Sequence, residues 1–270
     1  MKYTSISSYK APISAFLGFV IRGIEKLSSS IFNRTPIAHT SKIKKRLSKQ
    51  QKTILSGEVD FYKKLDKRYQ EHFEHRLTTF LRTYEFIGRE GHAIDVRTRV
   101  LIGSSYIILT FGKRKFITDV FDKILVYPDV FLSTSTQRKH KGEFNPKYKT
   151  VVFSWKHFLE GIHTKDDNVN LGIHEFTHII HIKSLQERDV SSMIFRRGYQ
   201  RLMNYLQNNE SVRKQILASN YFRRYAFENQ YEFIAVLIET FIETPDEFRA
   251  QFPRIYKKIK TMLNFNFLHY

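Results

Sequence analysis

The feature that most constrains the fold is His174-Glu175-Phe176-Thr177-His178, two histidines four residues apart with a glutamate after the first. On an α-helix, residues four apart differ by about 400° around the axis, so both imidazoles project from one face. The pattern therefore requires a helix that places two ligands on one metal ion. Glu175 lies beside the pair, where it can accept a proton from a water on that ion.

The flanking residues favour a helix from 168 to 185. Asn168 or Asn170 is suited to cap its start, because a short amide side chain accepts hydrogen bonds from the first free backbone N–H groups. Apolar residues recur at helical spacing and predict the buried stripe of this helix: Val169, Ile173, Phe176 and Ile180. The histidine pair is therefore predicted to lie on a buried helix.

Two histidines are too few to hold Zn²⁺, and the chain contains no cysteine, so a third ligand must be His, Asp or Glu. The favoured source is a helix over Gln230–Glu243, where Glu232 and Glu239 are seven residues apart and about 20° from the same face. Carboxylates in so apolar a run are costly unless a positive charge compensates them. A metal ion or an Arg or Lys from elsewhere would do so, and the spacing alone leaves both open.

Several segments resemble one known family. Residues 170–178 (NLGIHEFTH) and 225–245 (YAFENQYEFIAVLIETFIETP) are similar to the Mlc titration factor A (MtfA) family of bacterial zinc peptidases, which is related to the catalytic domain of the anthrax lethal factor protease. Residues 124–131 (ILVYPDVF), 151–155 (VVFSW) and 252–256 (FPRIY) are also similar to family segments. The resemblance covers about residues 58–263, with the motifs in the family's order.

The resemblance implies a zinc metallopeptidase of the HExxH…E type, with aminopeptidase activity as one option and a peptide or protein as substrate. One Zn²⁺ would be held by His174, His178 and Glu232. Glu175 would be the general base that activates water.

Two further roles follow from the resemblance alone. Tyr225, seven residues before Glu232, would be catalytic and donate a hydrogen bond to the oxyanion. Glu239 is expected to orient a ligand imidazole rather than to bind metal itself. The resemblance also supports an alternative function, a regulatory binding protein that sequesters a partner such as a transcriptional repressor, because the family's namesake sequesters the repressor Mlc.

Two histidines depart from the family pattern. His181 stands where family members commonly have Asp, three residues after the second ligand, and is expected near the site or at the surface. Some members carry a histidine before the cleft strand that approaches the metal, and only His140 lies in that segment here. Because it is surrounded by Arg and Lys, His140 is expected in a solvated loop.

The predicted fold is α+β, a mainly helical zincin-like (gluzincin) domain with a small mixed sheet. Apolar spacing predicts one helical stripe from Phe61 to Tyr84 and a buried helix over 100–111, and strands are predicted at 123–127 and 150–155. Residues 133–149 are polar and turn-rich, and the pattern is helical from 168 almost to the end. If 151–155 edges the sheet, it could hold an extended substrate by strand addition.

The chain is predicted to divide into a basic amphipathic extension with a linker, residues 1–55, and a metallopeptidase domain, residues 56–270. The formal charge is +19, and residues 1–52 carry +10 of it. Residues 11–27 predict an amphipathic helix that either packs on the domain or contacts a membrane surface. No apolar run is long enough to span a bilayer and no cleavage pattern follows, so a cytoplasmic protein, peripheral at the membrane in the second case, is expected.

The basic extension is only weak evidence for nucleic-acid binding. Aromatic residues are not interleaved with the basic cluster at 42–52 as base stacking would require, and no recognition fold is evident. Nucleic-acid binding is therefore not expected.

Overall fold

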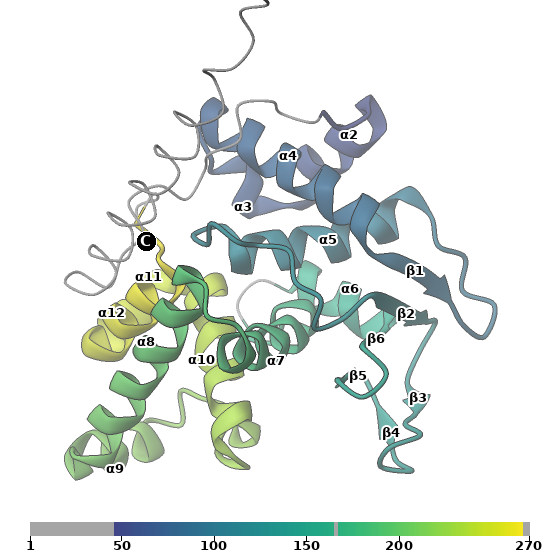
Figure 1. The fold of residues 1–270 in the computed structure, drawn as a ribbon. Helices are drawn as coiled ribbons and strands as arrows, with labels where there is room; N and C mark the ends of the chain where they lie inside the picture. The colour runs from purple at the N-terminus through teal and green to yellow at the C-terminus, as the bar shows by residue number, and fades with distance from the viewer. Residues whose placement is uncertain (1–45, 165–166, 267–270) are drawn as a thin grey trace, which may run out of the picture.

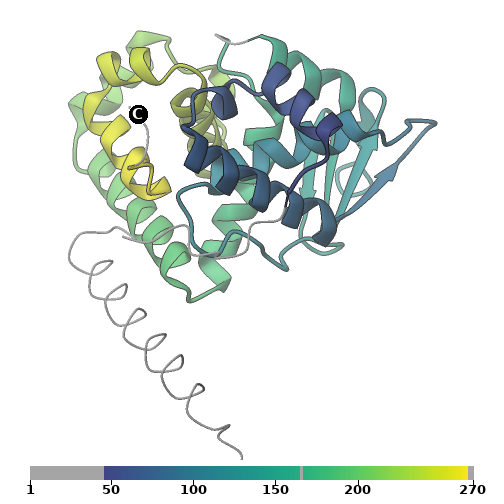
Figure 2. The ribbon, with the colours of Figure 1, turned by 90° about the horizontal axis from the view of Figure 1, so that it is seen from above.

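The computed structural model describes residues 46–164 and 167–266, and the amphipathic helix expected at 11–27 lies outside them. Within the described ranges, no helix is both long and apolar enough to cross a membrane. Most of the described chain is helical, and the strands, a four-stranded sheet and a two-stranded one, lie at one end of the molecule, at the right of Figures 1 and 2. The expectation of a mainly helical fold with a small mixed sheet is confirmed.

The first helices are α2 (Lys49–Glu58), α3 (Asp60–Lys63) and α4 (Lys67–Thr83). The single stripe expected from Phe61 to Tyr84 is divided between α3 and α4, because Asp66 accepts a hydrogen bond from Tyr69 N at 2.8 Å and starts a new helix. Helix α2 runs across the predicted domain boundary at residue 56, and Leu55 is fully buried. Packing on the core therefore begins before that boundary.

The sheet contains four strands in the order β1-β2-β6-β5. Strands β1 (Glu85–Gly88), β2 (Lys123–Tyr127) and β6 (Thr150–Ser154) are parallel, and β5 (Gly142–Asn145) is antiparallel to β6. The strands predicted at 123–127 and 150–155 are thus present, although Trp155 already begins a helix. Strand β6 is an inner strand, so the condition for strand addition at 151–155 is not met, and β5 is the outer strand on that side.

Residues 133–149, expected to be turns, contain two strands. Strand β4 (Lys139–His140) pairs with β3 (Phe131–Leu132) in a hairpin, and β5 follows directly. Both are short and polar, which is why no alternating apolar pattern marked them.

The buried helix expected at 100–111 is α5 (Val96–Thr110), capped by Asp95. After β6 comes α6 (Trp155–His163), which lies before the region predicted to be helical. From residue 168 onward the elements are helical, as predicted: α7 (Leu171–Gln186), α8 (Val190–Gln207), α9 (Glu210–Ser219), the 3-10 turn η1 (Arg224–Phe227), α10 (Gln230–Glu243), α11 (Pro245–Gln251) and α12 (Pro253–Leu263). Helix α7 lies between the sheet and the C-terminal helices (Figure 1).

One aromatic core joins the sheet to α4, α5 and α7. Phe176 of α7 is the central ring, with centroids 5.4 Å from Phe153 of β6, 5.1 Å from Tyr106 of α5 and 6.2 Å from Phe80 of α4. Such packed rings contribute beyond their buried area. Since Phe176 lies within the histidine motif, the same helix anchors the core and carries the polar pair.

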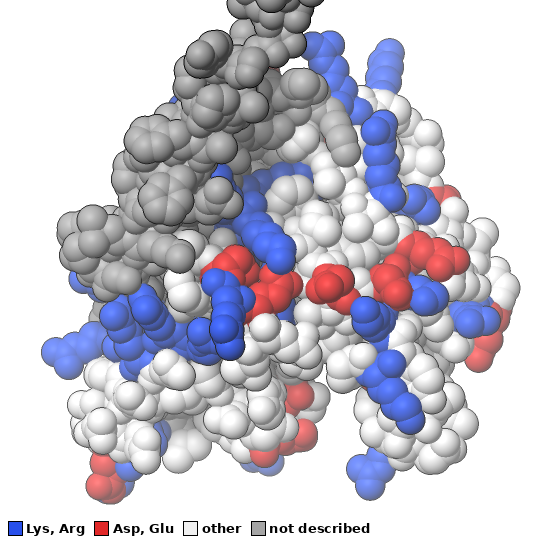
Figure 3. Space-filling view, in the orientation of Figure 1, with Lys and Arg blue, Asp and Glu red and all other residues white. Residues whose placement is uncertain are grey.

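Positive charge also gathers on the domain itself. Lys and Arg side chains cluster over α8 and α12 in Figure 3, where a groove is lined by Arg201, Arg254, Lys257 and Lys258 with no acidic residue among its lining side chains. The domain therefore carries a basic surface of its own, in addition to the charge of residues 1–52.

Candidate metal centre

Helix α7 places the two motif histidines on one face. Asn170 caps the helix by accepting a hydrogen bond from Ile173 N at 3.0 Å. One turn further on, the rings of His174 and His178 stand 4.8 Å apart between centroids. The predicted helical spacing of the pair is thus present in the structure.

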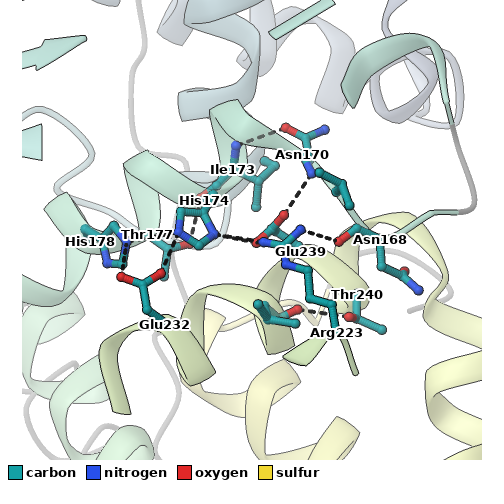
Figure 4. A network of polar contacts seen from close by, with 12 residues as sticks. Asn168, Asn170, Ile173, His174, Thr177, His178, Arg223, Glu232, Glu239 and Thr240 are labelled. Atoms are coloured by element: carbon teal, nitrogen blue, oxygen red, sulfur yellow. Dashed lines mark hydrogen bonds and ion pairs between the residues drawn. The ribbon is translucent and has the colours of Figure 1, made fainter. Parts of the chain in front are cut away.

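Helix α10 brings the predicted third carboxylate to this face. Glu232 Oε2 lies 2.8 Å from His174 Nε2, and Glu232 Oε1 lies 3.6 Å from His178 Nε2. The two histidine Nε2 atoms are 3.2 Å apart. Among the described residues, His174, His178 and Glu232 form the group able to hold a metal ion, with donor atoms within 4.8 Å of one another (Figure 4).

These atoms suit a zinc ion. Ligands at 2.0–2.1 Å from a tetrahedral Zn²⁺ are separated by about 3.3 Å. The distances between the donor atoms of His174, His178 and Glu232, at 2.8, 3.2 and 3.6 Å, lie on both sides of this value. Glu232 Oε2 is buried, and its described neighbour is His174 Nε2 at 2.8 Å. A bound cation would be shared by these two atoms in place of a proton.

Glu239, two helical turns after Glu232, holds His174 from the other side. Its carboxylate is fully buried, and Oε1 lies 2.6 Å from His174 Nδ1. Because a carboxylate only accepts, Nδ1 must carry the proton, which leaves Nε2 to face Glu232. The two carboxylates therefore contact opposite nitrogens of one ring (Figure 4).

Arg223 and Asn170 complete the surroundings of Glu239. Arg223 NH2 donates to Oε1 at 2.6 Å, and the backbone N–H of Asn170 donates to Oε2 at 2.8 Å. The sequence left open whether a metal ion or a basic residue compensates the charge of Glu239. In the structure Glu239 contacts both Arg223 and His174. Arg223 was not expected at the site from the sequence, and nothing in its local pattern marks it.

The carboxylates set the charge of His174. Burial lowers the pKa of His174, but hydrogen bonds with Glu232 and Glu239 outweigh burial and raise it to about 10. For Glu232, burial raises the pKa, but the two histidines outweigh it and hold the pKa far below its usual range. A metal at Nε2 would have to displace the His174 proton, so metal binding would release a proton.

Glu175 lies on the same helix, next to the outer strand β5. Its side chain is buried, which raises its pKa, and the nearby histidines act in the opposite direction. A Cβ atom on Gly142 of β5 would stand 2.6 Å from Glu175 Oε1 and 2.7 Å from Leu171 Cδ1. The strand can therefore approach the Glu175 carboxylate this closely only because residue 142 has no side chain.

Tyr225 stands at the open side of the group. It belongs to η1, its ring centroid is 5.7 Å from that of His174, and 42% of the residue is exposed. Partial burial raises the pKa of Tyr225, and the charge of Glu232 and a hydrogen bond with Glu232 raise it further. The phenol therefore remains protonated at neutral pH and is able to donate.

The profile of the glucose-regulated metallo-peptidase M90 family matches residues 36–263. The chain belongs to this family. The match agrees with the resemblance to MtfA-like proteins and begins twenty residues before the predicted domain boundary. The family indicates a metallopeptidase and hence a metal, for which the His174, His178 and Glu232 group is the candidate site.

An uncharacterized protein of Synechocystis sp. is similar to this M90-family chain. It is 23% identical over 231 residues, which cover 77% of this chain and 80% of the Synechocystis protein. The similarity thus extends over most of both proteins.

The two departing histidines lie apart from the metal group. His181 is buried against Tyr199, with ring centroids 4.3 Å apart, and burial lowers its pKa to about 4. His140 pairs in the β3–β4 hairpin and contacts Thr136 Oγ1 at 2.7 Å. Neither belongs to the metal-binding group formed by the described residues.

Proposed function

We propose that this protein is a zinc-dependent peptidase of the HExxH…E, gluzincin type that hydrolyses peptide bonds with water. The observation that carries the proposal is the convergence of His174, His178 and Glu232, with buried Glu175 beside them, in a chain of a metallopeptidase family. Zinc suits two imidazoles and one carboxylate better than Mg²⁺ or Ca²⁺, which prefer oxygen ligands.

Glu175 is proposed as the general base. When bound, Zn²⁺ would supply Lewis-acid activation of water and of the peptide carbonyl. Glu175 accepts the proton of the attacking water and then transfers it to the leaving amine nitrogen. Burial raises the pKa of Glu175 and brings it closer to neutral pH, as this exchange in both directions requires.

Tyr225 is proposed to stabilise the charge that develops on the carbonyl oxygen. Its hydroxyl donates a hydrogen bond to that oxygen, which strengthens as the oxygen becomes negative. Support comes from its position next to His174 and from its partial exposure, since the ring borders both the histidine pair and solvent.

The outer strand β5 is proposed to bind the substrate backbone. Ser154 N donates to Lys141 O, and antiparallel strands alternate, so Gly142 and Phe144 direct their N–H and C=O groups away from β6. An extended peptide could add to these groups as a further strand. Gly142 is also the residue against Glu175, so a peptide bound there would pass the general base.

The proposal is tested by metal analysis and a peptide-cleavage assay on the purified protein. About one zinc per chain is expected, and Glu175→Gln should keep the zinc while cleavage falls by roughly 10²–10⁴-fold. Glu247→Gln, an exposed position on α11, is the matched control and should cleave normally. Full cleavage by Glu175→Gln would contradict the mechanism.

The same assay addresses specificity. Peptides with free and with acetylated N-termini distinguish an aminopeptidase, which needs the free amine, from an endopeptidase. If Glu175→Gln instead retained the protein's biological role, the sequestration of a partner would become the better explanation.

A further inference from the structure

A second hollow lies between α5, α6, the first turn of α7 and the end of α10. Its volume is about 190 Å³. A cavity of roughly 150 Å³ can hold a benzene ring, so this one has room for a small organic molecule. Its wall is of mixed character, and the apolar side chains that line it are Val59, Phe61, Leu101, Ile108, Ile162, Ile173 and Ile242.

Glu243, the last residue of α10, places a carboxyl group in this apolar wall. Its Oε2 atom is buried and has no hydrogen-bond partner among the described residues. Burial, with the charges of Glu239 and Asp167, raises the pKa of Glu243 to about 8, although a hydrogen bond with Asn170 and the charge of Arg223 oppose this shift. A buried carboxyl group without a full set of partners costs folding free energy.

Several other polar groups of the wall have partners. Glu58 forms a two-point contact with Arg97, at 2.9 and 2.6 Å. The Ser104 hydroxyl donates to the Val100 carbonyl of its own helix at 2.7 Å, and Asp60 accepts from Lys63 at 2.8 Å. The wall thus carries three carboxyl groups against one ammonium group, that of Lys64, and Glu243 Oε2 is its buried acceptor without a hydrogen-bond partner among the described residues.

We propose that this cavity binds a small molecule with an apolar body and a primary ammonium group, which pairs with Glu243. The ammonium donates to Oε2 and its charge favours the ionised form of the Glu243 carboxyl group, while the apolar body replaces water against the isoleucine side chains. An anion would meet the carboxylate unfavourably, and a neutral apolar molecule would leave Oε2 without a partner. The proposal does not rest on the peptidase function.

The position of Asn170 connects this cavity to the metal centre. Its side chain hydrogen-bonds with Glu243, its N–H donates to Glu239, and Glu239 holds His174. Three hydrogen bonds therefore separate the cavity carboxyl from a metal ligand. A ligand that changes the contact between Glu243 and Asn170 acts on the residue that caps the metal-binding helix.

The test compares benzylamine with benzyl alcohol, which has nearly the same shape but no charge, by calorimetry on the full-length, zinc-loaded protein. Benzylamine is expected to bind at a single saturable site at least about tenfold more tightly than benzyl alcohol, the difference typical of one charged hydrogen bond. Glu243→Gln should remove this difference. The matched control Glu247→Gln, an exposed carboxyl on α11, should preserve it.

A second variant tests the location. Ser104→Leu places a larger side chain in the wall from α5 and should weaken both ligands, whereas Glu243→Gln should weaken the amine alone. If Ser104→Leu does not fold, the nearly isosteric Glu243→Gln still tests whether the amine binds at Glu243. Equal affinity for the two ligands in the wild type would overturn the proposal. So would amine binding unchanged in Glu243→Gln, which would place the amine elsewhere, for example at the metal.

Discussion

Helices α5 and α7 pack against each other and are both almost entirely buried, yet they satisfy their polar groups in different ways. In the buried middle and end of α5 the polar side chains include hydroxyls that bond within the helix, such as Ser104 to Val100 O and Thr110 to Tyr106 O, and its ionisable Arg97 and Arg99 stand near its start. In α7 the buried residues also include ionisable groups along the helix, and these find partners on other elements. His174 contacts two carboxylates of α10, and Lys183 Nζ donates to the carbonyls of Lys115 and Ile117.

The difference explains why the ionisable groups of the candidate metal centre depend on contacts between elements. A hydroxyl satisfied within its own helix needs nothing from the rest of the molecule, whereas a buried charge needs a partner from another segment. Helix α7 therefore forms correctly only when α10, β5 and the loop after α5 are in place. Mutations should affect function and stability together in α7 and only slightly in α5.

The largest effect is expected from Glu239→Ala. The change leaves Arg223 and His174 Nδ1 without their acceptor in a buried setting, which should lower the free energy of unfolding by roughly 3–5 kcal/mol. It should also weaken zinc binding by about 10–100-fold, because the ligand ring is no longer oriented. Urea unfolding and zinc competition with a chelator measure the two effects.

Glu247→Ala on α11 is the control for loss of a carboxylate at an exposed position. It should change neither quantity appreciably. Unchanged zinc affinity in Glu239→Ala would show that the ring is oriented by something other than this carboxylate.

A smaller effect is expected from Gly142→Ala, which tests whether β5 positions Glu175. The added methyl would press on the buried carboxylate, so kcat should fall by about 10–100-fold with zinc content unchanged. Gly57→Ala is the matched control, because nothing lies within 4 Å of a Cβ there. Loss of zinc together with activity in Gly142→Ala would mean general disruption instead.

Lys113→Met tests a buried charge where the segment after α5 meets α7. Burial and the charge of Lys183 lower the pKa of Lys113 from 10.5 to about 7. The unfolded chain therefore keeps a proton that the folded protein releases, and wild-type stability should rise as pH increases from about 7 to 10.5. The variant should lack this rise and be more stable near pH 7, by roughly 4 kcal/mol.

Urea unfolding of both proteins across this pH range measures the difference between the curves. The advantage of Lys113→Met should disappear toward pH 10.5. Parallel curves would show that the lysine is charged in the folded protein.

Ser104→Ala should have the smallest effect. It removes one hydrogen bond made within α5 and creates no unpaired charge, so the free energy of unfolding should fall by less than about 1.5 kcal/mol. Zinc affinity should be unchanged. A loss as large as that of Glu239→Ala would remove the contrast between the two helices.

Local spacing predicted much of the site. The four-residue spacing of His174 and His178 and the seven-residue spacing of Glu232 and Glu239 each place a pair on one helix face, and helix geometry is nearly independent of context. The structure adds that both carboxylates of α10 meet the same ring of α7. Their metal-binding and catalytic roles remain predictions until metal and activity are measured.

Contacts between distant segments could not be predicted in this way. Strand β5 is short and polar and pairs with β6, so no apolar alternation marked residues 142–145 as the outer strand beside 151–155. Arg223 reaches Glu239 only because η1 folds back beside α7, and Gly142 matters only because β5 lies against Glu175. The periodicity of the sequence does not indicate which distant segments come into contact.

Both nitrogens of the His174 ring contact carboxylates from a single helix, and the two glutamates start from backbone positions about 10 Å apart along its axis. A slip of α10 by one residue would turn both acids away at once, so the ligand and the group that steers the imidazole are gained or lost together. Metal affinity should therefore report the register of α10 in an all-or-none manner, without half-formed sites of intermediate strength.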